Sequence, residues 1–425
     1  MQKDYFKIAG FLIILIMLSG NASSQSAEPL NVERCYELAR LNYPLIRQKE
    51  LVLKSKEYTI ANAHSGYLPQ LSIIGSATYQ SDVTRLPGPV VLVEPLSKDQ
   101  YRIYGEINQN IYDGNTIRRQ SSIYETNSLI EGQKVEVELY KIKERINQIF
   151  FGALLMDEQL TQIDLLKSDL QSSLKKVEAS ILNGTAFRTN ADILKAELLK
   201  AEQRAIETKA NRKAFIEMLG IFINLSLGDN TPLQRPAGIT VSGEPTINRP
   251  ELTLYNFQSQ LLGAQYQLTN TRMLPRLGFF VQGGYGRPGL NVLKNEFDTY
   301  YLGGFRFNWN LGGFYNTKRD KELLEVNLQT INLQKETFLF NTNLALRQQN
   351  QELYKLQELI SVDDQIIGLR KQIKATAKAQ LDNGVITAND FLRELNAEDL
   401  ARQNLSLHQI QLLMTHYNYQ TTSGN

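Results

Sequence analysis

Cysteine and histidine, which supply many catalytic and metal-binding groups, are scarce in this chain of 425 residues. A single cysteine, Cys35, excludes an internal disulfide and a thiolate metal cluster. The three histidines, His64, His408 and His416, are few and scattered along the chain, so we expect no histidine-rich metal site. There is no phosphate-binding glycine loop, no His-Glu-x-x-His and no nucleophile elbow. The sequence therefore predicts a protein that is not an enzyme and has no cofactor and no metal site.

Net charge and long apolar runs are also lacking. The 46 basic and 44 acidic side chains leave a net charge of +2, whereas nucleic-acid binding needs a basic surface, so nucleic acid is excluded as a partner. The mean hydropathy of −0.31 argues against a helical membrane protein. The apolar run at residues 8–18 is too short to span a bilayer, which needs about 20 residues. It follows two lysines and precedes small residues, so we assign residues 1–24 as a signal peptide and expect export.

The chain contains short motifs that recur in the same order. Pro44 and Pro69 are 25 residues apart, and so are Pro250 and Pro275. An Asn-Gly pair at 183–184 recurs at 383–384. This duplication, with the glycines and prolines between the copies, predicts three regions after the signal peptide. They are a first structural repeat at 25–223, an irregular linker at 224–247 and a second structural repeat at 248–425.

Each repeat ends in two stretches whose apolar residues recur every three or four positions, which is typical of a helix face. In the first repeat, residues 114–182 form one such stretch, and a helix of that length would measure about 100 Å. The Asn-Gly pairs interrupt the pattern, and glycine is favoured after a helix because it adopts a left-handed conformation. We therefore expect Gly184 and Gly384 at the turns of two long antiparallel helical hairpins.

Aromatic residues are abundant, with 20 tyrosines and 17 phenylalanines, and many fall in four segments of alternating polarity. One face of each segment is apolar and aromatic, and the other carries Arg, Glu, Asn and Gln, as expected for strands. A soluble sandwich would explain any one strand, but not four strands of membrane-crossing length followed by such long helices. The expected strands are 71–80, 101–111, 277–285 and 301–311.

Four strands are too few to stay in a membrane alone. Unpaired strand edges cannot be hydrated in lipid, and closed barrels begin at about eight strands. If these strands enter a membrane, several copies of the chain must share one barrel. The sequence thus predicts a homo-oligomer.

The duplicated order of Asn-x-Pro, Leu-Pro-x-Leu, strand pair, long helix and Asn-Gly turn resembles the TolC-type outer-membrane efflux protein family over essentially the whole mature chain. The resemblance implies a mainly α fold with β structure, in which duplicated helical hairpins form a periplasmic α-barrel. Each subunit of a homotrimer would contribute four strands to a shared outer-membrane β-barrel. Residues 224–247 and the C-terminal residues would form an equatorial belt around the tunnel.

The resemblance also implies a function. The chain would be a passive exit duct of a tripartite efflux pump or a type I secretion system, located in the outer membrane of a Gram-negative bacterium and extending into the periplasm. Its partners would be a periplasmic adaptor (membrane fusion) protein, an inner-membrane pump or ABC exporter, and outer-membrane lipid. The alternative is a periplasmic coiled-coil scaffold or adaptor without its own channel, which would not need four lipid-length strands.

The same resemblance places candidate pore residues at the hairpin turns, where family members close the tunnel. Asp390 matches a selectivity-ring aspartate and Asp192 a gate acid, while Arg393 stands where an acid is usual. Leu381 and Ile386 occupy the gate tyrosine and gate arginine positions, so Arg393 could form a different latch with Asp390 or Asp192. Three copies of Asp390 around an axis would concentrate cations. Alternatively, both acids lie in the first turn of a helix, where negative charge is favoured.

Overall fold

The computed structural model describes residues 29–84, 96–237 and 246–425. The expected signal peptide and residues 238–245 of the expected linker lie outside the described residues. Contacts divide the chain into two compact units, and each unit takes segments from both expected repeats. The repeat boundaries stay a prediction. Unit 1 comprises the described residues of Met1–Tyr43, Ile142–Gly243 and Gln349–Tyr419, and unit 2 those of Pro44–Lys141, Glu244–Gln348 and Gln420–Asn425.

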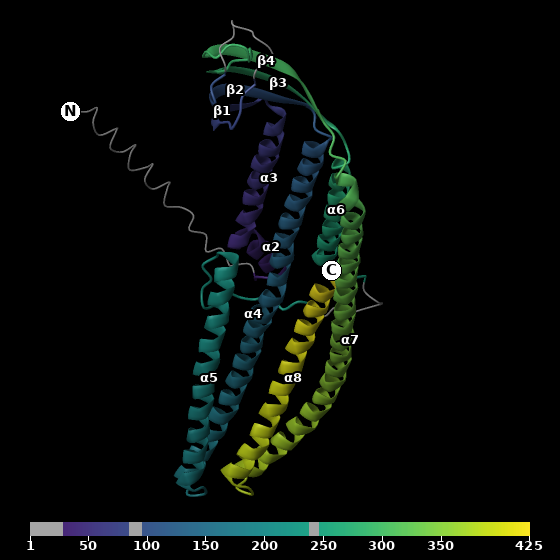
Figure 1. Cartoon of the computed structure of the whole chain (residues 1–425). Helices are drawn as coiled ribbons and strands as arrows, with labels where there is room; N and C mark the ends of the chain where they lie inside the picture. Colours follow the sequence, from purple (N-terminus) through teal and green to yellow (C-terminus); the bar gives the residue numbers. More distant parts are fainter. Residues whose placement is uncertain (1–28, 85–95, 238–245) are drawn as a thin grey trace, which may run out of the picture. The chain divides into compact units, whose positions relative to one another are not determined.

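Unit 2 contains a four-stranded antiparallel sheet in the order β1-β2-β3-β4 (Figure 1). The two central strands, β2 and β3, come from different halves of the sequence. They pair through Gly105 opposite Gly283 and Glu106 opposite Gln282, among other positions. The four strands expected from alternation are thus confirmed. Their bounds are β1 Gln70–Tyr79, β2 Asp99–Tyr112, β3 Arg276–Arg287 and β4 Asp298–Asn308.

Strand β4 ends three residues before the expected end at residue 311, so this boundary of the sequence prediction is wrong. The cause is a turn that begins at Asn310. Its side-chain oxygen accepts a hydrogen bond from the backbone N–H of Gly312 (3.0 Å), and helix α7 starts at Gly313. Trp309 has left the strand, and its indole N–H donates to the Met273 carbonyl at 3.0 Å.

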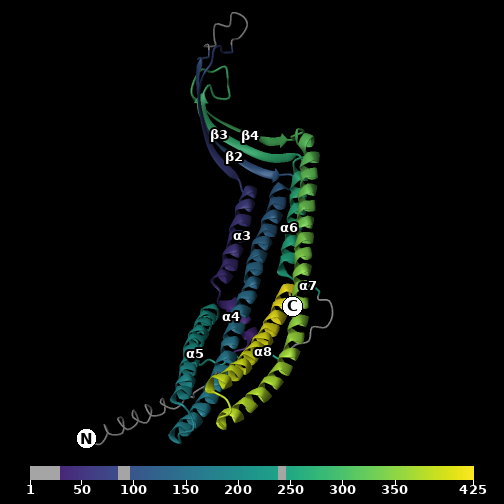
Figure 2. The ribbon, with the colours of Figure 1, turned by 90° about the horizontal axis from the view of Figure 1, so that it is seen from below.

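Four helices accompany the sheet in unit 2. Helix α3 (Gln48–His64) precedes β1, and helix α6 (Pro250–Thr271) precedes β3. The proline at the first position of α6 costs no hydrogen bond, since a first-turn N–H has no helical partner. The first part of α4 (Thr116–Leu182) lies beside α3, and the first part of α7 (Gly313–Asp382) lies beside α6 (Figures 1 and 2).

Unit 1 is built from two helical hairpins and the short helix α2 (Val32–Asn42). The later part of α4 turns into α5 (Arg188–Ile223), and the later part of α7 turns into α8 (Ala388–Ser423). One apolar core joins all four helices, so the two expected long hairpins are confirmed and pack on each other. Among the described helices, none is both long and apolar enough to cross a bilayer. The fully buried members of the core include Leu170, Leu194, Phe391 and Leu395.

Candidate functional sites in the hairpin turns and the sheet

The two hairpin turns of unit 1 have the same backbone geometry. Gly184 and Gly384 both have φ of +71°, in the left-handed region that favours glycine. In the first turn the N–H of Gly184 donates to the Ile181 carbonyl (3.0 Å) and that of Thr185 to the Ser180 carbonyl (2.9 Å). The second turn repeats both bonds. This pair of bonds is the Schellman motif, which satisfies the last carbonyls of a helix and stops it.

Asp390 lies at the start of α8 and caps that helix. Its Oδ2 accepts hydrogen bonds from the Thr387 hydroxyl (2.7 Å) and the Thr387 backbone N–H (3.2 Å). In return the Thr387 hydroxyl oxygen accepts from the Asp390 backbone N–H at 3.2 Å. These bonds lower the pKa of Asp390, the side-chain bond most, followed by the backbone bond. Asp390 is therefore a stable anion with a structural role, and its carboxylate still faces the hollow described below.

Asp192 and Arg393 are placed differently from the expectations. Asp192 is exposed and lies one residue beyond the first turn of α5, which holds no acid. Asp390 is therefore a first-turn acid, as expected. The same expectation is wrong for Asp192, because the first hairpin has two more residues between its glycine and its aspartate. The Arg393 guanidinium pairs with Glu394 at 3.0 Å, rather than with Asp390 or Asp192. The alternative latch is therefore not formed within one chain.

Leu381 and Ile386 belong to the apolar core of unit 1. Neither side chain is available for a polar latch. Between the two turns lies an open hollow of about 640 Å³, bordered by Phe187 and Asn190 from the first turn and by Asp382 and Asp390 from the second. Asp382 is paired with Lys176 at 2.5 Å, so the hollow carries the Asp390 carboxylate next to a neutralised pair.

A charged network that the sequence analysis missed ties the two hairpins together. Lys374 on α7 reaches Asp169 on α4 (2.9 Å) and Glu398 on α8 (2.6 Å), and Arg402 also pairs with Glu398 (2.6 Å). Burial alone would lower the pKa of Lys374, but its hydrogen bonds to Glu398 and Asp169 raise it overall. Burial raises the pKa of the neighbouring Asp399 carboxyl. The Arg204 guanidinium, 3.3 Å away, lowers this pKa but offsets the effect of burial only in part. The lysine therefore holds its charge between two hairpins.

The sheet of unit 2 has one apolar face that is exposed in the single chain. Ile73 is 79% exposed and Tyr301 is 85% exposed, values that are unusual for large apolar side chains in a folded domain. The strand register places these residues on one face, because positions two apart along a strand share a side. The other exposed apolar residues of this face include Leu71, Tyr79, Ile103, Ile107, Phe305 and Phe307.

The opposite face of the sheet, called the polar face below, carries a connected polar cluster, although Ile74, Phe280 and Leu302 also lie on it. Glu106 is only 6% exposed and accepts hydrogen bonds from the side-chain amides of Asn108 and Gln282. The Arg306 guanidinium lies 3.6 Å from Glu106 and donates to the Asn108 side-chain oxygen at 3.2 Å. The same guanidinium lies 4.7 Å from the centre of the Phe280 ring. Sequence alternation identified this face, but only the register brings residues from three strands together.

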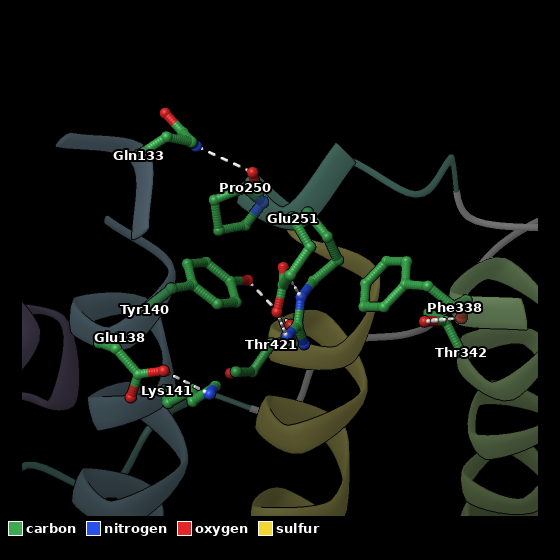
Figure 3. Close-up of polar contacts among 10 residues, drawn as sticks. Gln133, Glu138, Tyr140, Lys141, Pro250, Glu251, Phe338, Thr342 and Thr421 are labelled. Atoms are coloured by element: carbon green, nitrogen blue, oxygen red, sulfur yellow. Dashed lines mark hydrogen bonds and ion pairs between the residues drawn. The ribbon is translucent and has the colours of Figure 1, made fainter. Parts of the chain in front are cut away.

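The C-terminal residues are anchored at the start of α6 (Figure 3). The Arg249 guanidinium pairs with both carboxylate oxygens of Glu251, one at 2.9 Å, and lies 4.9 Å from the Tyr140 ring centre. The Tyr140 hydroxyl donates to the Thr421 carbonyl at 2.8 Å, as the figure shows. Burial raises the pKa of Tyr140, so it stays a donor at neutral pH. The N–H of Asn248, in the expected second repeat, donates to the Ser423 carbonyl at 2.7 Å.

The described part of the expected linker lies against unit 1. The Leu30 N–H donates to the Pro232 carbonyl (3.0 Å), and the Gln234 N–H donates to the Leu30 carbonyl (2.9 Å). Arg212 on α5 donates to the carbonyls of Asp229 and Thr231. Apart from this contact with Leu30, residues 224–237 form no helix or strand, which fits the expected irregular region. Within the residues that the structure describes, no three His, Cys, Asp or Glu side chains are grouped to hold a metal ion.

Comparison with solved structures identifies the fold. The outer membrane protein VceC from Vibrio cholerae matches with a TM-score of 0.65 at 14% identity, covering 93% of this chain and 96% of that chain. The CmeC outer membrane channel of Campylobacter jejuni matches with a TM-score of 0.64 at 12% identity, covering 92% and 85%. The open-state MtrE outer membrane channel of Neisseria gonorrhoeae matches with a TM-score of 0.65 at 12% identity, covering 93% and 89%.

The sequence itself gives no further match. No protein-family model and no curated protein matches the chain. At identities of 12–14%, the likeness to the solved channels shows a shared fold along nearly the whole chain. The fold of the single chain that the sequence resemblance implied is confirmed, whereas the trimeric assembly stays a prediction.

Proposed function

We propose that this chain is the outer-membrane channel of a tripartite efflux pump or type I secretion system. It acts as a passive exit duct for small molecules or polypeptides, located in the outer membrane of a Gram-negative bacterium and extending into the periplasm. The observation that carries this proposal is the sheet of unit 2, which exposes a continuous apolar face in a fold shared with outer-membrane channels. A large exposed apolar face marks a protein or membrane interaction surface, and on strands of membrane-crossing length we assign it to lipid.

The edges of the sheet support a homotrimer. Within the described residues, β1 and β4 are its two edge strands, and neither has a partner on its outer side. Unpaired backbone groups are not tolerated in lipid, so neighbouring copies must pair β1 with β4. Three four-stranded sheets give a closed barrel of twelve strands, above the minimum of about eight. Its polar face, with Glu106 and Arg306, then lines the duct.

The hairpins of unit 1 supply the periplasmic tunnel in this proposal. Their exposed apolar residues, such as Leu199 and Ile206 on α5, need partners in neighbouring subunits or in a periplasmic adaptor protein. A passive duct supplies no energy for transport. In this proposal an inner-membrane pump or ABC exporter supplies it. Residues 224–247 and the C-terminal anchor at Arg249 form the equatorial belt.

The hairpin turns supply the tip of the tunnel. Asp390 forms the pore ring, with Arg393 and Asp192 next to it and Gly184 and Gly384 holding the turns. The lowered pKa of Asp390 supports this role, because an ionised carboxylate is what a cation-attracting ring requires.

The test combines location, assembly and conductance. We expect the full-length chain in the outer-membrane fraction, extractable only with detergent, trimeric by cross-linking, and conducting in planar bilayers. The alternative function, a periplasmic scaffold or adaptor without a channel, predicts a protein released without detergent that gives no conductance. A soluble monomer would overturn the proposal.

A further inference from the structure

The polar face of the sheet has a gap at Gly278. The register places Gly278 on β3 directly opposite Asn110 on β2 and Arg306 on β4. Because glycine has no side chain, no β3 side chain stands between these two neighbours on this face. A β-bulge follows at once, since the pairing of β2 with β3 shifts between Asn110 and Tyr112. Bulges of this kind re-aim side chains near functional sites.

Nitrogen donors surround the gap. Arg276 lies two positions before Gly278 on the same face, and its direct neighbour on β4 is Asn308. Arg272 approaches from the end of α6. Together they line an open hollow of about 480 Å³, whose lining holds three arginines and several asparagines beside Leu274, Leu277 and Phe279, but no aspartate or glutamate. An acid-free hollow with this many donors favours a negatively charged occupant.

The three arginines are not equally neutralised. Arg272 pairs with Asp320 outside the hollow at 2.6 Å. Arg306 is held by Asn108 (3.2 Å) and lies 3.6 Å from Glu106, so its position is fixed before any ligand arrives. Arg276 is exposed and has no ion-pair partner among the residues that the structure describes. The hollow therefore carries one uncompensated positive charge beside a prepositioned guanidinium.

We propose that this hollow binds an oxyanion, the carboxylate or phosphate group of a solute passing along the polar face. Arg276 supplies the free charge, and its planar guanidinium matches the two oxygens of such a group. Arg306 and Asn308 add donors from β4. This inference rests on the proposed function, because only in an exit duct would the bound anion be a transported solute. It names anionic solutes as a class that the duct binds briefly during their exit.

The sheet geometry indicates a soluble ligand rather than a lipid headgroup. Arg276, Arg306 and Asn308 lie on the polar face, whereas the apolar residues that would meet lipid lie on the other. A phosphate on a membrane lipid would have to reach the opposite side of the sheet. The bound group is therefore assigned to the water-filled side.

The experiment is a calorimetric titration of the full-length, detergent-solubilised protein with inorganic phosphate and with citrate. We expect Arg276→Gln to weaken phosphate binding by about tenfold, as for the loss of one charged hydrogen-bonding group. Arg276→Lys should recover part of the lost affinity, because lysine restores the positive charge but lacks the planar, paired donors of the guanidinium. The matched control is Arg102→Gln, an exposed arginine on the same polar face, opposite Gly286 and away from the hollow. Equal binding by the wild type and Arg276→Gln, or no binding by either, would overturn the site.

Further measurements distinguish a failure of the anion site from a failure of the exit duct. In planar bilayers, a channel whose block by citrate is unchanged in Arg276→Gln overturns the anion site but leaves the exit duct intact. A chain that binds phosphate through Arg276 in detergent but never conducts overturns the duct and leaves the site. Micelles of phosphatidylglycerol test the lipid source, and a dependence on Arg276 seen only with this lipid overturns the proposal.

Discussion

Thr387 and Asp390 cap helix α8 reciprocally, with each residue's side chain accepting a hydrogen bond from the other's backbone N–H. This arrangement is a capping box with aspartate in place of the usual glutamate. Asp390 also lines the hollow between the two hairpin turns. Under the proposed function this residue has two separable roles, in capping the helix and in supplying negative charge at the tunnel tip.

The charge role predicts the response of the channel to multivalent cations. Asp390→Ala should relieve inhibition by a trivalent cation in planar-bilayer conductance, because the proposed ring would lose its three carboxylates. Asp390→Asn should do the same while keeping an oxygen for the cap. Thr387→Ala is the matched control, since it weakens the cap but keeps the carboxylate and should remain sensitive. Unchanged inhibition in Asp390→Ala removes this residue from the ring.

The capping role predicts a dependence on pH. The pKa of Asp390 is lowered by its bonds to Thr387, so the folded turn binds the proton less tightly than the unfolded chain does. The contribution of the cap is therefore complete above the unfolded aspartate pKa of about 3.9 and is lost as the pH falls through the lower, folded value. Hydrogen exchange over residues 383–395, corrected for intrinsic rates, should show loss of protection in that range.

Thr387→Ala tests the origin of this pH dependence. The variant should lose about 1 kcal/mol of helix stability at neutral pH, as for other N-cap replacements. It should also show a weaker acid response than the wild type, because the hydroxyl bond that lowers the Asp390 pKa most is gone, whereas the bond from the residue-387 backbone N–H remains. An identical acid response in wild type and variant would assign the shift to another group.

The sequence predicted the elements whose signals are local. Strand alternation located four strands, and Asn-Gly located both turns, because each depends on residues close together in the chain. The end of β4 was missed, since the alternation runs on through Trp309 and Leu311 although the turn at Asn310 has already begun. Local periodicity cannot show where a competing turn takes over.

Contacts between distant residues could not be predicted in the same way. Lys374 lies 205 positions from Asp169, and Gln282 lies 176 positions from Glu106, so no spacing in the sequence connects these partners. Asp390 was located by resemblance, but its bond to Thr387 follows a local capping pattern that the sequence does contain. Arg249 lies at the start of a repeat and gave no signal of its anchoring role, because apart from Glu251 its partners Tyr140 and Thr421 come from α4 and the C-terminal residues.

The network at Lys374 makes the packing of the hairpins sensitive to one charge. Lys374→Ala leaves Glu398, which is 3% exposed, with one cation fewer, and should destabilise unit 1 by about 3 kcal/mol. Lys355→Ala removes a surface pair with Glu352 on the same helix and should cost about 0.5 kcal/mol or less. Denaturation followed by circular dichroism compares the two variants, and equal midpoints would show that the network adds no stability.

The anchor at Arg249 predicts the consequences of loosening the C-terminus. Arg249→Ala leaves Glu251 buried without its bidentate partner, at a cost of about 3 kcal/mol, and Arg249→Lys should recover only part because lysine cannot make the paired bonds. Tyr140→Phe removes only the hydrogen bond to Thr421, so about 1 kcal/mol is expected. Both changes should expose residues 420–425 to carboxypeptidase, with Arg249→Ala cleaved faster. Resistance of Arg249→Ala equal to that of the wild type would show that the backbone bond between Asn248 and Ser423 holds the C-terminus without the arginine.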